Sequence, residues 1–225
     1  MMYENVIKDF EDVIDITDKF NTFSFNFALN SLKEAESNLR FLLGVPGSGK
    51  TFLLNVFHYQ NPDTLYINKP LTKEQFENFT ASTILIDEAQ LLDKDTIEYI
   101  RILADEKRFT FVLAMHLKET EEILSKEHFK SRTIDIIKLN PITEEEMIQY
   151  INKKLLIDGA NHLFTEKEFH QIYKYTKGNF RYIKKFVRTL FKLLNFAVKH
   201  NLEKYKKINS CLITMTAIKL GLEDE

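Results

Sequence analysis

The 225-residue sequence contains one cysteine, Cys211, which excludes an intramolecular disulfide framework. It also lacks the uncharged apolar run of about twenty residues that a membrane-spanning helix requires. The most apolar stretch, Phe186–Val198, is interrupted by Arg188 and Lys192. Residues 1–15 carry acidic side chains where a secretory signal would begin with basic ones. We therefore expect a cytoplasmic protein.

The charge is unevenly distributed along the chain, although the net charge is only −2. Residues 1–39 hold eight acidic side chains and three lysines, whereas residues 174–207 hold eleven basic side chains and one acidic one, Glu203. A basic segment of this kind is a candidate surface for an acidic partner, such as DNA or an anionic membrane. The alternative is a solvated lysine face without a partner.

Residues 39–138 alternate short β-rich runs with helical patterns, and no repeat or low-complexity linker interrupts them. This alternation is typical of a parallel sheet covered by helices. It predicts a three-layer α/β/α sandwich with a parallel five-stranded sheet. The expected strands are Leu39–Leu43, Thr64–Ile67, Thr83–Ile86, Phe109–Met115 and Thr133–Lys138.

The pattern changes at Pro141, beyond which we expect only helices. Thr143 and Thr165 are each followed three residues later by glutamate, the arrangement of a capping box at a helix start. Gly178-Asn179 precedes a third long helical stretch. The expected divisions are a lead segment (1–38), an α/β core (39–140) and a C-terminal helical lid (141–225).

Residues 44–51, Gly-Val-Pro-Gly-Ser-Gly-Lys-Thr, match the phosphate-loop pattern between an apolar strand and an apolar-periodic helix. Glycines let successive amides point at phosphate oxygens, and the helix N-terminus adds its positive dipole end. We expect Lys50 to reach the β- and γ-phosphates and Thr51 to ligate Mg²⁺. The alternative is a chance glycine turn. The expected nucleotide-binding residues are Gly44, Val45, Pro46, Gly47, Ser48, Gly49, Lys50, Thr51 and Phe52.

A second motif supports the first, because the apolar run 83–86 ends in the acid pair Asp87-Glu88. Ligands of open α/β sheets lie at the carboxyl ends of the strands. We expect Asp87 to hold Mg²⁺ and Glu88 to orient or deprotonate the attacking water. The alternative is a strand end that turns into solvent.

Three further side chains are candidates for phosphate contacts. His116 follows the apolar strand 109–115, where a polar side chain can touch the γ-phosphate. Arg132 lies just before the fifth expected strand, and Arg181 lies near the start of the helix after Gly178-Asn179. Guanidinium groups stabilise the charge on a transferring phosphoryl group. For each of the three, an ordinary structural or surface position is the alternative.

With these motifs in this order, the chain resembles the AAA+ ATPases, and within them the ExeA/GspA type associated with bacterial secretion. The similarity runs from about Phe27 to Phe186. It is carried by segments that look like the family's second nucleotide motif, the helix after it, the join to the lid, and the lid's glycine turn. These segments are Asp87–Leu92, Ile100–Leu103, Leu139–Ile142 and Lys177–Ile183.

The resemblance implies roles for the remaining candidates. Arg181 looks like the sensor-2 arginine, which contacts the nucleotide of its own subunit. Arg132 looks like the arginine finger, which reaches a neighbour's nucleotide and implies a homo-oligomer. His116 falls where the family usually has the sensor-1 glutamine. The resemblance also implies ATP with Mg²⁺, since no guanine-reading motif follows Asp87-Glu88.

Three functions remain open at this stage. The first is an ATP-driven accessory motor or switch of a secretion, pilus or DNA-uptake (competence) apparatus, acting through protein partners at the inner membrane. The second is a DNA-bound AAA+ regulator of transposition or replication that uses the basic stretch 174–207. The third is a nucleotide-gated adaptor that does not hydrolyse ATP.

Overall fold

Residues 3–11, 13–17, 20–117, 120, 125 and 133–222 are described by the computed structural model, and they divide into two units. Residues 16–140 form an α/β unit, and residues 141–225 join the residues up to Asp15 in a helical unit. The lead segment 1–38 is therefore not one piece, because its first part belongs with the C-terminal helices.

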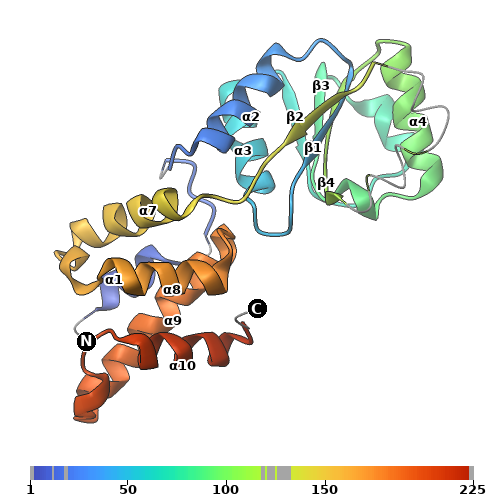
Figure 1. Cartoon of the computed structure of the whole chain (residues 1–225). Coiled ribbons are helices and arrows are strands. Elements are labelled where there is room, and N and C mark those ends of the chain that lie inside the picture. Colours follow the sequence, from blue (N-terminus) through green and yellow to red (C-terminus); the bar gives the residue numbers. More distant parts are fainter. Residues whose placement is uncertain are drawn as a thin grey trace. The chain divides into compact units, whose positions relative to one another are not determined.

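The α/β unit, whose helices and strands are drawn in Figure 1, contains an all-parallel five-stranded sheet. The strand order is β2-β3-β4-β1-β5. The expected three-layer fold is confirmed, and the fourth and fifth strands begin one and two residues later than expected. The strands are β1 (Leu39–Leu43), β2 (Thr64–Ile67), β3 (Thr83–Ile86), β4 (Thr110–Met115) and β5 (Asp135–Lys138).

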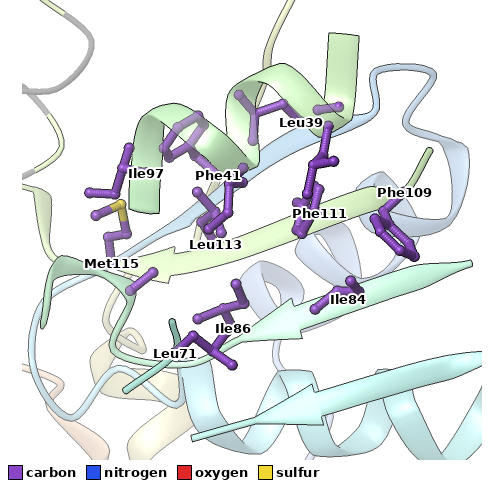
Figure 2. Packing of buried hydrophobic residues seen from close by; sticks show 14 of the residues in the cluster. Leu39, Phe41, Leu71, Ile84, Ile86, Ile97, Phe109, Phe111, Leu113 and Met115 are labelled. Carbon is purple, nitrogen blue, oxygen red and sulfur yellow. The ribbon is translucent and has the colours of Figure 1, made fainter. Parts of the chain in front are cut away.

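Helices cover both faces of this sheet, so its central strands are apolar on both sides. Helices α2 (Phe23–Glu34) and α3 (Lys50–Gln60) pack with Leu42, Leu85 and Val112 on one face. Helix α4 (Lys94–Asp105) packs with the alternate strand residues on the other, as Figure 2 shows for Phe41 and Leu113. Two 3₁₀ turns, η1 (Lys73–Asn78) and η2 (Ala89–Leu91), complete the described part of this unit.

The helical unit contains the three helices whose starts the sequence predicts, together with a short N-terminal helix, a C-terminal helix and two 3₁₀ turns. The Thr143 hydroxyl accepts from the Glu146 amide at 3.2 Å, and the Glu146 carboxylate accepts from the Thr143 amide at 2.9 Å. The Thr165 box is also formed. The elements are α1 (Glu4–Asp9), α7 (Glu144–Ile157), η3 (Asn161–Leu163), α8 (Glu166–Thr176), α9 (Phe180–Lys199), η4 (Glu203–Tyr205) and α10 (Ser210–Leu220).

Helix α1 is anchored in this unit by aromatic contacts. Phe10 is 1% exposed and meets Tyr150 of α7 edge to face, with ring centroids 5.9 Å apart. Tyr3 meets Phe191 of α9 in the same way at 5.1 Å. Edge-to-face pairs stabilise beyond the area that they bury, so a short helix is held by packing rather than by its own propensity.

The acidic N-terminal residues neutralise part of the basic stretch 174–207. Glu11 forms an ion pair with Arg188 at 2.7 Å. Burial lowers the pKa of Lys154, nearby Lys184 lowers it further, and Asp9 and Asp15 oppose this. Arg188, which belongs to the basic stretch 174–207, therefore already contacts an acidic segment of the same chain.

Within the described ranges, none of the helices is both long enough and apolar enough to cross a membrane.

Candidate nucleotide-binding site

The carboxyl ends of three neighbouring strands bring the predicted motifs together. Strand β4 lies between β3 and β1, and all three run parallel. Leu43 pairs with Met115 and Ile86 pairs with Leu113, so Gly44, Asp87 and His116 follow strand ends at one edge of the sheet. Adjacent strands lie about 4.8 Å apart, which places the three segments within reach of one ligand.

The phosphate loop forms a backbone cradle that ends in the first turn of α3. Gly47 and Gly49 have φ values of 80° and 100°, which only glycine adopts at low cost. A Cβ atom on Gly44 would lie 2.8 Å from the Leu139 carbonyl oxygen and 2.5 Å from Ser48 Oγ. The close packing of this loop therefore requires glycine, which has no side chain, at position 44.

The loop fits an anionic ligand. The N-cap residue of α3 is Gly49, which has no side chain that could accept from the first amides of the helix. Ser48 Oγ is buried and has no hydrogen-bond partner among the described residues. Lys50 is 5% exposed, and its ammonium donates to the carbonyl oxygens of Gly44 at 2.9 Å and Val45 at 3.3 Å. A phosphate group would complement this buried positive charge and the orphaned hydroxyl.

The remaining loop residues support this cradle. Val45 accepts from the Ser48 amide at 3.1 Å, which closes the turn around the exposed Pro46. Thr51 is half-buried in the first turn of α3. Phe52 packs against the core on the α2 side, with its ring 5.6 Å from that of Phe25.

Asp87 is a buried carboxylate, 7% exposed, whose orientation is fixed from several sides. Its amide donates to the Ile67 carbonyl at 2.8 Å, and its Oδ1 accepts from the Glu88 amide at 3.0 Å. Its Oδ2 accepts from the Tyr66 hydroxyl at 3.0 Å. Burial, and then the charge of Asp87, raise the pKa of Tyr66 to about 12. Tyr66 therefore stays protonated and keeps donating.

Glu88 lies next to His116, which sequence reasoning did not foresee. Its backbone is left-handed (φ 50°), and its side chain projects at the start of η2. Glu88 Oε2 lies 3.1 Å from His116 Nε2 and also accepts from the side-chain Nε2 of Gln90. The structure thus brings His116 to the proposed catalytic carboxylate.

The two candidate arginines differ in what the structure describes. Arg181 lies in the first turn of α9 in the helical unit, where its side chain is exposed and Asn179 caps the helix. Arg132 lies outside the described residues, so its role stays a prediction.

The described residues fit a magnesium ion that takes most of its ligands from phosphate and water. They contain no group of three or more His, Cys, Asp or Glu side chains able to hold a metal alone. Mg²⁺ commonly uses one or two protein oxygens together with substrate phosphates. Two protein oxygens of this kind are available. Thr51 lies in the first turn of α3, after the phosphate loop, and Asp87 follows β3.

Comparisons with known proteins show the fold. No family model and no curated protein sequence matches the chain. Solved structures do match it, and they assign the chain the fold of P-loop ATPases. RuvB of Thermotoga maritima, a Holliday junction branch migration motor, has a TM-score of 0.60 and 21% identity, covering 89% of this chain and 68% of RuvB.

Two archaeal structures give the same result. A Walker-type ATPase of Pyrococcus abyssi has a TM-score of 0.64 and 14% identity over 95% of this chain and 79% of its own. Cdc6p of Pyrobaculum aerophilum has a TM-score of 0.56 and 16% identity over 88% of this chain and 67% of its own. Neither these structures nor RuvB points to the ExeA/GspA type in particular.

Proposed function

We propose that the chain binds ATP with Mg²⁺ and hydrolyses it to ADP and phosphate. The observation that carries this proposal is the set of groups at the carboxyl edge of β1, β3 and β4. A helix N-terminus with glycine at its N-cap and the buried Lys50 follow one strand, and Asp87 and Glu88 follow another. The fold that the chain shares with P-loop ATPases supports the same reading.

The residues divide the work by their chemistry. The loop amides and Lys50 would bind the β- and γ-phosphates, and Thr51 and Asp87 would hold Mg²⁺. The metal would neutralise charge on the phosphate oxygens. Glu88 accepts a proton from the water whose oxygen attacks the γ-phosphorus, and the bond to the β,γ-bridging oxygen breaks as ADP leaves.

Two arginines complete the proposed machinery. Arg181 would contact the nucleotide of its own subunit, and Arg132 would reach the nucleotide of a neighbour in a homo-oligomer. Both roles rest on the AAA+ resemblance of their segments. A guanidinium spreads its charge over several donors, which suits the oxygens of a transferring phosphoryl group.

The test is phosphate release together with nucleotide binding. Lys50→Ala removes the buried ammonium and should abolish ATP binding. Glu88→Gln keeps the metal ligands but loses the base, so ATP should still bind while turnover falls by roughly two to four orders of magnitude. ATP binding by Lys50→Ala at wild-type affinity would disprove the phosphate site. Binding without phosphate release by the wild-type protein would favour the non-hydrolysing adaptor.

For the process that the ATPase drives, we propose a switch or motor of a secretion, pilus or DNA-uptake machine, peripheral to the inner membrane through protein partners. The similarity of Asp87–Leu92 and Lys177–Ile183 to the ExeA/GspA type supports it. The fold of RuvB, a branch migration motor, favours a second candidate, a DNA-bound regulator. Genes for pilins beside this one would support the first role, and a transposase gene would support the second.

A further inference from the structure

Tyr66 lies in the sheet beside the strand that ends in Asp87. It occupies the third position of β2, opposite Leu85 of β3 in the parallel register. Its half-buried ring packs against the cluster that contains α3. Its hydroxyl extends beyond the ring to Asp87 Oδ2 at 3.0 Å.

This hydroxyl completes the fixation of the Asp87 carboxylate. Oδ1 is held by the Glu88 amide at 3.0 Å, and Oδ2 is held by Tyr66. Two donors from different elements, one on each oxygen, define the plane of the carboxylate. Without the Tyr66 hydroxyl, the backbone amide alone would restrain the group, and rotation about its terminal bond would be broad.

We propose that Tyr66 is a positioning residue of the magnesium site, which orients the Asp87 carboxylate toward the metal. The inference rests on the proposed function, because it assigns Thr51 and Asp87 to Mg²⁺. Side chains that orient metal ligands typically change metal affinity by 10- to 100-fold when they are replaced.

The test is the Mg²⁺ dependence of ATP binding by Tyr66→Phe, measured by titration calorimetry in the full chain. Phenylalanine keeps the packed ring and removes only the hydroxyl. We expect the Mg²⁺ concentration that half-maximally tightens ATP binding to rise about 10-fold. ATP affinity in EDTA should stay at the wild-type value, and the melting temperature without ligands should fall only by the cost of one lost hydrogen bond to a buried carboxylate.

The matched control is Tyr59→Phe, because Tyr59 is 71% exposed on α3. It should leave the Mg²⁺ dependence unchanged. If Tyr66 acts only through packing of its ring, Tyr66→Phe should also leave the Mg²⁺ dependence unchanged. A half-maximal Mg²⁺ concentration equal to that of the wild-type protein would therefore overturn this inference and leave the proposed ATPase function intact. If the wild-type protein bound ATP without any effect of Mg²⁺, the proposed magnesium site would fail first, and the inference with it.

Discussion

Gly178 should be the least replaceable glycine of the helical unit, and a comparison with Gly159 isolates the reason. Both have positive φ, 70° and 64°. A Cβ on Gly159 would meet nothing within 4 Å, whereas on Gly178 it would lie 2.1 Å from the Ile142 carbonyl oxygen. The atom in the way is backbone, so no side-chain rotation relieves the clash.

The expected free-energy costs follow from these contacts. Gly159→Ala should cost roughly 1–2 kcal/mol, the penalty of a left-handed backbone for a residue with a Cβ. Gly178→Ala should cost more, because the added Cβ atom must also push the Gly178 backbone away from Ile142. The Ile142 amide donates to the Gly178 carbonyl at 3.0 Å, and Tyr173 donates to the Ile142 carbonyl at 3.3 Å. Losing one or both, with buried groups left unpaired, should add about 3 kcal/mol.

The assay is urea unfolding of both variants and the wild-type protein, followed by far-ultraviolet circular dichroism. The left-handed penalty is common to the two substitutions, so their difference measures the clash. Equal destabilisation by the two variants, or a cost below about 2 kcal/mol for Gly178→Ala, would refute the reasoning.

Two further predictions concern partners. Arg132→Ala should lower ATP hydrolysis by the assembled protein without changing ATP affinity. Mixing this variant with Glu88→Gln should restore some turnover. If no mixing ratio restores turnover, Arg132 does not act as an arginine finger between subunits. The triple variant Lys185→Glu/Lys192→Glu/Lys199→Glu reverses the charge of three exposed lysines, and it should bind duplex DNA or anionic vesicles more weakly. The slope of the logarithm of the binding constant against the logarithm of salt concentration should become shallower by about one unit per lost phosphate contact. Unchanged binding, or equal loss in a control that reverses exposed lysines of the α/β unit, would leave the solvated lysine face as the explanation. The control substitutions are Lys33→Glu, Lys94→Glu and Lys107→Glu.

The fold was largely predictable because its signals are local. Strand β3 and its acid pair stand out as an apolar run followed by charge, and a capping box at Thr143 or Thr165 needs only four residues. The division of residues 1–38 between two units was not predictable in this way. It depends on contacts such as Phe10 with Tyr150, which are 140 positions apart in the sequence and leave no periodic pattern.

The candidate site shows the same limit at the level of single side chains. Lys50, Asp87 and Glu88 were predicted because their motifs combine residue type with spacing. Tyr66 was missed because tyrosine in a strand is ordinary, and only the pairing of β2 with β3 brings it to Asp87. His116 was predicted as a γ-phosphate contact, yet its contact with Glu88 depends on the turn after β3.

The uneven charge of the sequence is partly balanced in the structure, because the acidic N-terminal residues lie in the same helical unit as the basic stretch 174–207. In the sequence, the acidic residues 1–39 and the basic residues 174–207 are far apart, and the basic stretch is a candidate surface for an external acidic partner. In the helical unit, Glu11 pairs with Arg188, while Asp9 and Asp15 act on Lys154 beside Lys184. The pair is partly exposed, and such pairs contribute only about 0–1 kcal/mol to stability. Its larger effect is on recognition, because a partner that approached Arg188 would have to displace a carboxylate of the same chain. Anion binding is therefore best tested by substituting Lys185, Lys192 and Lys199. These lysines recur every seven residues along one exposed side of α9.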